Sequence, residues 1–176
     1  MGSGVEAIKE LREATSCGVI ECKNALEESG GDHEKAKKIL RKRGLELAAK
    51  KGSRTAKEGR IESYIHLGSK IGVLAEVNCE TDFVAKNDDF IQFSKDVAMH
   101  IAAMNPTYIR KEDIPEDVLA EQKDKDAFVK GSCLLEQPFV KDSKLTIQDC
   151  LNNLVAKIGE NMFVSRFSRF KVGQVD

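Results

Sequence analysis

The sequence predicts an α+β protein in which three helices precede a mixed core. Three observations predict this class. Apolar residues recur at helical spacing up to Gly44, their period changes from 3.6 to 2 at Ile61, and two helices and a final strand follow. Helices and antiparallel strands in this order are typical of α+β domains. The hydrophobic fraction of 41% is sufficient for a packed core.

Three short helices are predicted for the first domain, residues 1–47. They cover Val5–Ala14, Val19–Ser29 and a segment that Asp32 caps and Gly44 ends. The apolar residues of the first helix are one turn apart, and those of the other two helices are expected to face inward: Val5, Ile8 and Leu11, then Ile20, Cys22, Ala25 and Leu26, then Ala36, Ile39 and Leu40. A unit of this size buries little surface, so we expect it to bind a partner.

A basic segment, residues 48–59, follows these helices. Its lysines and arginines could contact an acidic partner. Runs of charge are usually solvated, however, so a linker is the favoured interpretation.

The core, residues 60–176, begins with a predicted hairpin over residues 60–79. Apolar and polar residues alternate along its second half, and a glycine-containing loop separates the two strands. A helix is predicted over residues 88–104, with Asn87 as its cap and two aspartates in its first turn. The residues expected on its buried stripe are Phe90, Phe93, Val97, Ile101 and Met104.

The rest of the core is predicted to contain one more helix and one more strand. Residues 107–133 indicate a variable, exposed connection with at most one short helix. The helix over residues 146–158 begins with a capping box formed by Thr146 and Asp149. The strand over residues 161–171 is expected to complete a three-stranded antiparallel sheet, because an isolated hairpin is only marginally stable in water.

The composition argues against several classes of partner. The 28 lysines and arginines nearly balance the 29 aspartates and glutamates, giving a net charge of −1, which disfavours direct binding to nucleic acid. Apolar runs stay well short of the ~18 residues that a membrane span needs, and a secretory signal pattern is absent. The five cysteines have no zinc-ligand spacing and are predicted to be reduced thiols, so we expect no metal and no cofactor.

Catalytic motifs are also missing, since the sequence contains no glycine-rich phosphate loop, zinc-protease motif or nucleophile elbow. Cys79 is the candidate nucleophile to weigh. It precedes Glu80 and Asp82 at the end of a predicted strand, and His66 and His100 are candidate bases. A buried cysteine at a strand end is the simpler interpretation, so we expect a protein that is not an enzyme.

Phe83 stands out because it lies among charged residues between a predicted strand and a predicted helix. One interpretation is a core aromatic residue that fixes the loop to the helix, and composition favours it. The other is a wedge, an aromatic side chain that is presented to enter a crevice on a partner. The residues themselves leave both open.

Three stretches of the chain carry a family resemblance. They are Leu11-Arg12-Glu13-Ala14-Thr15 with Cys22-Lys23-Asn24-Ala25-Leu26; Glu76-Val77-Asn78-Cys79-Glu80-Thr81-Asp82-Phe83-Val84-Ala85-Lys86-Asn87; and Leu135-Glu136-Gln137-Pro138-Phe139-Val140-Lys141-Asp142 with Ala156-Lys157-Ile158-Gly159-Glu160-Asn161 and Arg166-Phe167-Ser168-Arg169-Phe170. In this order they resemble the elongation factor Ts family, the nucleotide exchange factors of the translational GTPase elongation factor Tu. The resemblance favours the wedge interpretation of Phe83.

The resemblance implies two functional regions. The N-terminal helices would form a ubiquitin-associated-like domain that binds the nucleotide-binding domain of the GTPase; the matching contact positions are Leu11, Arg12, Val19, Ile20 and Lys23. The second region would displace Mg²⁺ from the GTPase, with the phenyl ring intruding between partner side chains and the preceding aspartate as its companion contact; it comprises Thr81, Asp82, Phe83 and Val84. Val19-Ile20 departs from the methionine pair associated with the family at this turn.

The function implied by this resemblance is guanine nucleotide exchange in translation. The protein is expected to bind GDP-bound and nucleotide-free elongation factor Tu and to promote GDP release so that GTP can bind. A bacterial cytosol, or the matrix of an organelle, is the expected location. The chain has a single copy of the core, as in the short forms of the family, some of which work as homodimers. The stretch between Glu121 and Leu134 is shorter than expected even for a short form. The alternative is a non-enzymatic interaction module with a passive core, which has no reason to expose Phe83.

Overall fold

The computed structural model describes residues 4–15 and 17–174, apart from the side chains of Ala48 and Ala49. Helices and a three-stranded antiparallel sheet are both present, which confirms the α+β class. The chain divides into two compact units, residues 1–55 with 151–161 and residues 56–150 with 162–176. We predicted a continuous core over residues 60–176, whereas this division assigns residues 151–161 to the first unit.

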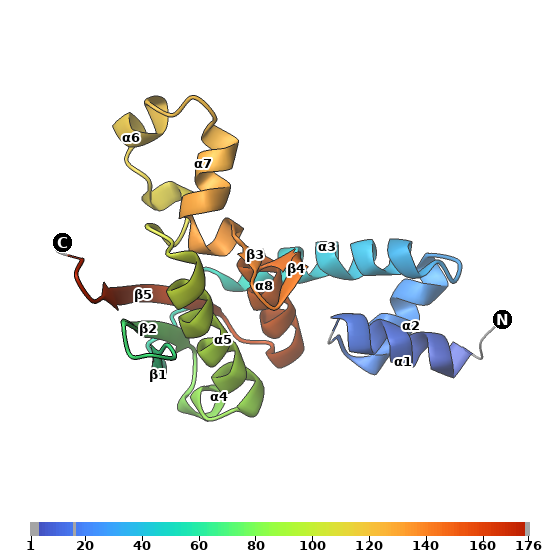
Figure 1. Cartoon of the computed structure of the whole chain (residues 1–176). Helices are drawn as coiled ribbons and strands as arrows, with labels where there is room; N and C mark the ends of the chain where they lie inside the picture. The colour runs from blue at the N-terminus through green and yellow to red at the C-terminus, as the bar shows by residue number, and fades with distance from the viewer. Residues whose placement is uncertain (1–3, 16, 175–176) are drawn as a thin grey trace. The chain divides into compact units, whose positions relative to one another are not determined.

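The first unit contains α1 (Gly4–Thr15), α2 (Val19–Glu28) and α3 (His33–Lys51), shown in blue to cyan in Figure 1. The predicted break between the first two helices includes Ser16, which lies outside the described residues. Small side chains dominate the core of the three helices; its buried members are Leu11, Cys17, Cys22, Ala25, Leu26, Ala36 and Leu40, with Ala7, Ile8 and Ile39 packed against them. Burial of Ile20 was predicted and is wrong, because its side chain is 74% exposed. Side chains two positions apart on a helix point to nearly opposite sides, so Ile20 cannot share the buried side of Cys22.

The third helix is longer than predicted. It continues through Gly44 to Lys51, so the expected end at Gly44 is wrong. Residues 48–51 are helical and residues 58–59 belong to the first strand, so the linker predicted over 48–59 is also corrected, to residues 52–57. A glycine that ends a helix adopts a positive φ. Gly30, after α2, has φ 65°, whereas Gly44 is buried within the helix and is not among the positive-φ residues.

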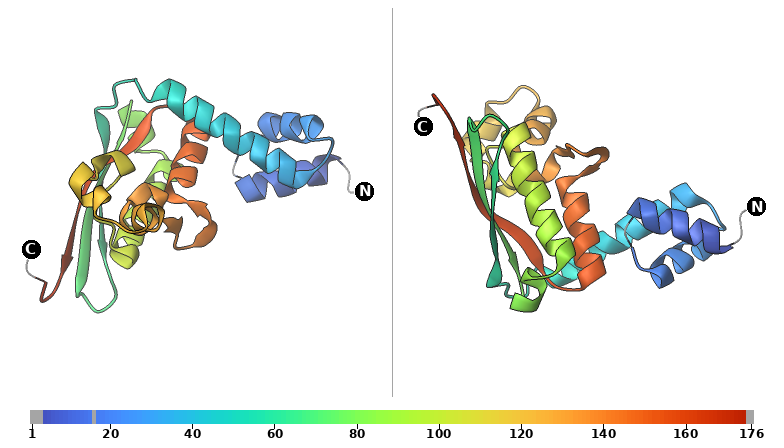
Figure 2. Two further views of the ribbon diagram at one scale, coloured as in Figure 1. Left: turned by 90° about the horizontal axis from the view of Figure 1, so that it is seen from above. Right: turned by 60° about the horizontal axis from the view of Figure 1, so that its bottom comes forward.

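The second unit is built on a sheet with the strand order β1-β2-β5, in which both pairs are antiparallel as predicted. The strands are β1 (Glu58–Ile65), β2 (Ile71–Cys79) and β5 (Met162–Lys171). Along β2 the buried residues alternate as predicted; they are Val73, Ala75, Val77 and Cys79. One face of the sheet is covered by α5 (Asp88–Met104), which contacts β1 and β2 (Figures 1 and 2).

Both ends of α5 are fixed by local interactions. Asn87 is the predicted cap, and its Oδ1 accepts a hydrogen bond from the backbone N–H of Asp89 at 2.9 Å. Asn105 ends the helix in the left-handed conformation, at φ 50°. The buried stripe is confirmed except at Met104, which is 41% exposed. Met104 is the last helical residue, so the prediction extended the stripe one position too far.

Residues 107–133 form more structure than predicted. They contain a 3₁₀ turn (Lys111–Asp113), α6 (Glu116–Ala120) and α7 (Lys125–Ser132), so the expectation of at most one short helix is wrong. These elements have a small core of their own; it comprises Ile114, Val129 and Cys133, with Tyr108, Val118, Leu119 and Phe128 against it. Backbone hydrogen bonds from Thr107 to Ser132 and from Leu134 to Tyr108, both 2.8 Å, close the base of this excursion.

The segment before the last helix contains a second 3₁₀ turn, Leu134–Glu136, and a small hairpin of β3 (Pro138–Phe139) and β4 (Asp142–Thr146), which the sequence did not predict. The last helix, α8 (Ile147–Ile158), begins with the predicted capping box. The backbone N–H of Asp149 donates to Oγ1 of Thr146 at 3.1 Å, and the N–H of Thr146 donates to Oδ2 of Asp149 at 3.0 Å. Within the described part of the chain, none of the helices is both long enough and apolar enough to cross a bilayer.

Candidate functional site

A single helical turn, α4 (Asp82–Ala85), lies between β2 and α5. Thr81 begins it in an extended conformation, at φ −126° and ψ 152°. Its hydroxyl oxygen accepts a hydrogen bond from the backbone N–H of Val84 at 3.3 Å. Its carbonyl oxygen accepts another from the N–H of Ala85 at 3.2 Å. Thr81 is therefore an N-cap that satisfies amide donors of the first turn.

Phe83 is presented to solvent by this turn. Its side chain is 80% exposed, whereas that of Val84 is only 6% exposed. Successive side chains on a helix point about 100° apart, so the turn can bury one and expose the other. The interpretation of Phe83 as a core aromatic residue is therefore wrong. An exposed ring is what the wedge interpretation requires.

The turn is attached to larger elements at both of its ends. After Phe83, Val84 is buried, and its carbonyl accepts a hydrogen bond of 2.9 Å from the N–H of Asn87, the cap of α5. Before Phe83, the thiol of Cys79, the last residue of β2, donates to the carbonyl of Thr81 at 3.1 Å. One turn of helix has little stability of its own, so these attachments determine how Phe83 is held.

Asp82 and Lys86, which precede and follow Phe83 in the sequence, form an exposed ion pair. Lys86 Nζ lies 2.8 Å from Oδ2 of Asp82, four residues earlier. The hydrogen bond from Lys86, together with its charge, lowers the pKa of Asp82, and the same interaction raises the pKa of Lys86. Both groups are therefore ionised at neutral pH. Sequence reasoning did not single out Lys86, although its spacing of four residues from Asp82 was visible.

The five N-terminal positions divide into one buried and four exposed residues. Leu11 is fully buried in the core of the first unit, so it offers a partner no surface, and the expectation of a direct contact there is corrected. The exposed positions are Arg12, Val19, Ile20 and Lys23. Val19 and Ile20 are the first two residues of α2, and Lys23 forms an exposed ion pair of 3.8 Å with Glu27.

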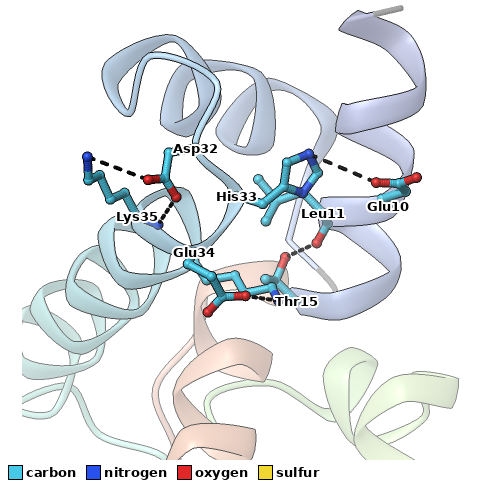
Figure 3. Close-up of polar contacts among 8 residues, drawn as sticks. Glu10, Leu11, Thr15, Asp32, His33, Glu34 and Lys35 are labelled. Carbon is cyan, nitrogen blue, oxygen red and sulfur yellow. Dashed lines mark hydrogen bonds and ion pairs between the residues drawn. The ribbon is translucent and has the colours of Figure 1, made fainter. Parts of the chain in front are cut away.

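Polar contacts fix the helices that carry these positions. The hydroxyl of Thr15 donates to the carbonyl of Leu11 at 2.6 Å, at the end of α1. At the start of α3, the backbone N–H of Lys35 donates to Oδ1 of Asp32, and His33 lies 4.0 Å from Glu10 of α1 (Figure 3). The Asp32 cap was predicted, and its bond of 3.0 Å confirms it. The exposed pair Val19-Ile20 is thus carried by a small unit with defined helix ends.

The structure gives no support to a thiol active site at Cys79. The two histidines considered as bases are engaged elsewhere: His66 contacts the hydroxyl of Tyr64 at 3.2 Å, and Nε2 of His100 lies 3.0 Å from Oε1 of Gln137. Cys79 donates its thiol hydrogen to a backbone carbonyl. Among the described residues, no group of three or more histidine, cysteine, aspartate or glutamate side chains is arranged to hold a metal ion.

Comparison with known proteins identifies similar chains along almost the full length. The family model described as "Elongation factor TS" matches residues 11–127. The chain is 48% identical, over 192 aligned positions and 96% of each chain, to the elongation factor Ts of Caldanaerobacter subterraneus subsp. tengcongensis. It is 50% identical to that of Geotalea uraniireducens, covering 95% of this chain and 88% of the relative. It is 47% identical to that of Fervidobacterium nodosum, covering 99% and 100%.

These alignments are longer than the chain itself. The alignment with the Caldanaerobacter protein has 192 positions, whereas the chain has 176 residues. The relative therefore has residues, within the aligned region, for which this chain has no counterpart.

Proposed function

The chain belongs to the elongation factor Ts family and is a translation elongation factor; on this premise we propose that it is the guanine nucleotide exchange factor of elongation factor Tu. It binds the GDP-bound GTPase, displaces Mg²⁺ and promotes GDP release, so that GTP can bind. The observation that carries the proposal is the 80% exposure of Phe83 on a turn that is attached at both ends. A location where translation takes place, the bacterial cytosol or an organelle matrix, follows from this role.

Exchange of this kind requires no covalent chemistry. The factor must bind the nucleotide-free GTPase more tightly than the GDP-bound one. Because linkage is reciprocal, GDP weakens binding of the factor by the same ratio by which the factor weakens GDP binding. A typical coupling of ~1–3 kcal/mol weakens GDP about 5–150-fold.

Displacing Mg²⁺ is an effective way to obtain this coupling, because the metal neutralises and bridges phosphate oxygens in such sites. Phe83 would enter between partner side chains that support the metal and would shift them. Burial of its ring on the partner contributes about 1.5–3 kcal/mol, since most of the ring is in water before binding. Asp82, already ionised, would contact a polar group of the partner beside the ring.

The N-terminal unit would supply affinity that does not depend on the nucleotide. Its exposed apolar residues, Val19 and Ile20, together with Arg12 and Lys23, are the proposed contacts with the nucleotide-binding domain. Leu11 would act indirectly, by holding α1 in the three-helix core. This proposal differs from a passive module because it assigns a role to each unit.

The face of the sheet opposite α5 supports a second proposal, a homodimer. This face carries large apolar side chains that are exposed; they are Ile61, Ile65, Leu74 and Phe170. Glu76 and Arg166 form an ion pair of 2.6 Å on the same strands. Exposed apolar patches of this kind typically bind protein, and a second copy of the chain is the proposed partner. Sedimentation velocity should detect dimers that Leu74→Arg abolishes; a wild-type monomer at all concentrations would contradict the proposal.

The exchange proposal is tested by replacing Phe83. Release of a fluorescent GDP analogue from elongation factor Tu is followed by stopped flow over a range of factor concentrations. The Phe83→Ala variant should bind the GDP-bound GTPase with nearly unchanged affinity, because the N-terminal unit supplies that binding. Its maximal release rate should fall about tenfold or more, because loss of about 1.4 kcal/mol of ring burial corresponds to tenfold. Leu67→Ala is the matched control, since Leu67 is a large apolar residue that is 94% exposed at the hairpin turn. An unchanged maximal rate for Phe83→Ala would refute the proposed function.

A further inference from the structure

Cys79 occupies the position from which the turn that carries Phe83 starts. It is the last residue of β2, the central strand, and it is paired with Glu58 of β1 and with Met162 of β5. Its side chain is fully buried. The strand therefore holds this residue from both sides, and the chain has only Glu80 between Cys79 and the N-cap Thr81.

The Cys79 thiol contacts the atom on which the turn depends. The carbonyl oxygen of Thr81 accepts hydrogen bonds from the Cys79 thiol at 3.1 Å and from the N–H of Ala85 at 3.2 Å. The same residue caps the turn through its hydroxyl, at 3.3 Å from the N–H of Val84. A rotation of the peptide plane that contains the Thr81 carbonyl would disturb both hydrogen bonds to this oxygen. It would also change the direction in which Phe83 points.

We propose that Cys79 is a positioning residue for nucleotide exchange: its thiol hydrogen bond fixes the Thr81 peptide and thereby the orientation of the Phe83 ring toward the partner. This inference rests on the proposed function of Phe83. It gives the cysteine a role that is neither catalytic nor redox, since the thiol acts as a hydrogen-bond donor and remains reduced.

A purely structural role for Cys79, as a small apolar residue in the core, predicts a different pattern of variants. Packing is preserved best by Cys79→Val, which is apolar, β-branched and suited to a strand, but has no donor. The donor is preserved by Cys79→Ser, which is more polar and packs less well. If only packing matters, valine should be the milder change; if the hydrogen bond matters, serine should be.

The experiment measures release of the fluorescent GDP analogue from elongation factor Tu, as a function of factor concentration, with full-length variants. Cys79→Val should lower the maximal rate about threefold to tenfold, the effect of one lost hydrogen bond, with the dissociation constant changed by less than about twofold. Cys79→Ser should recover most of the rate. Cys79→Ala repeats the donor loss without added volume, in case the larger valine disturbs folding. Cys133→Ala is the matched control, because Cys133 is also fully buried but lies in the small core of the 107–133 excursion.

A double-variant comparison separates this inference from the proposed function. In a Phe83→Ala background, Cys79→Val should cause no further loss of rate, because the group it positions is already gone. The inference is overturned if Cys79→Val is as fast as wild type, if Cys79→Ser is as slow as Cys79→Val, or if the same loss persists without Phe83. A wild-type rate for Phe83→Ala alone would overturn the proposed function instead.

Discussion

Phe83 and Ile20 are comparably exposed, at 80% and 74%, but the protein holds them differently. Phe83 lies on a four-residue helix whose two ends are attached to a central strand and to a seventeen-residue helix. Ile20 lies in the first turn of a ten-residue helix that packs only through small side chains and Leu26. The first arrangement restricts the direction of one ring, whereas the second displays an apolar surface on a small unit.

This difference suits the two separate tasks that the proposed function assigns to these regions. In that proposal Phe83 shifts groups around a metal ion that is bound to the partner. It must keep its orientation while it contacts those groups, so attachment to the larger unit is an advantage. A surface that only has to adhere to the GTPase in every nucleotide state needs apolar area and little rigidity. The comparison therefore predicts that changes near Phe83 affect maximal rate, whereas changes near Ile20 affect affinity.

The largest effect is expected from replacing Val19 and Ile20 together with alanine. Their burial on the partner contributes about 1.5–3 kcal/mol for each side chain, of which alanine keeps only part, so affinity should fall about tenfold to a hundredfold. The maximal release rate at saturating factor should stay near that of wild type. Titrations by stopped flow provide both quantities.

The matched control for this variant is Val5→Ala, because Val5 is a 77% exposed apolar residue of the same unit. It should leave both quantities unchanged. A fall in maximal rate for the Val19 and Ile20 variant, with affinity intact, would contradict the division of tasks.

A second, smaller difference between the two units concerns their stability at acid pH. His100 is fully buried in the larger unit, where Nε2 contacts Gln137 and Nδ1 accepts from the N–H of Val140 at 3.3 Å. Burial lowers the pKa of His100 below its usual value. In the three-helix core, burial raises the pKa of the Cys17 and Cys22 thiols, which therefore stay neutral throughout the acid range.

The direction in which pH changes the stability of the larger unit follows from the lowered pKa of His100. In the unfolded chain His100 takes up a proton near pH 6.5, whereas in the folded protein it does so only at lower pH. The stability of the larger unit should therefore fall as the pH drops below about 6.5, by at most about 1.4 kcal/mol per pH unit, until the folded pKa is reached.

Hydrogen exchange followed by mass spectrometry at several pH values checks this prediction by region. Peptides of α5 should lose protection on acidification, after correction for intrinsic exchange, and peptides of α2 should not. His100→Gln should remove the pH dependence, whereas replacement of the exposed His66 should keep it. Equal acid sensitivity of both regions would show that His100 does not control it.

The features that were predicted correctly from the sequence are those that depend on residues close together in the chain. The caps at Asp32, Asn87 and the Thr146 and Asp149 pair were predictable, because each cap and its partner are within three residues. The course of α3 was not, because Gly44 resembles a helix-ending glycine in sequence, and only its backbone conformation shows otherwise. The small core of residues 107–133 was missed for a related reason, since its apolar members are too scattered to show a period.

The same limit applies to the candidate site, where features that depend on packing between distant residues could not be predicted from the sequence. Residues 81–84 were identified by a family motif, but the exposure of Phe83 could not be derived from composition, which favoured burial. Whether the ring faces the interior depends on burial of the neighbouring Val84, which is a tertiary fact. Leu11 is the opposite case, because the motif implied a contact and the packing of three helices buries it.

The smallest effect is expected at the Asp82 and Lys86 pair, which tests what holds the turn. Both side chains are mostly in water, so the pair should add little to stability, and Lys86→Gln should leave the unfolding temperature unchanged. The maximal release rate should also be preserved, because Cys79, Thr81 and Val84 remain in place. Affinity should rise by no more than about threefold, as the freed Asp82 carboxylate meets the partner without a competing cation.

Lys95→Gln, which removes an exposed cation from α5, is the control. A loss of maximal rate as large as that of Phe83→Ala would show that the ion pair, and not the buried attachments, orients the ring.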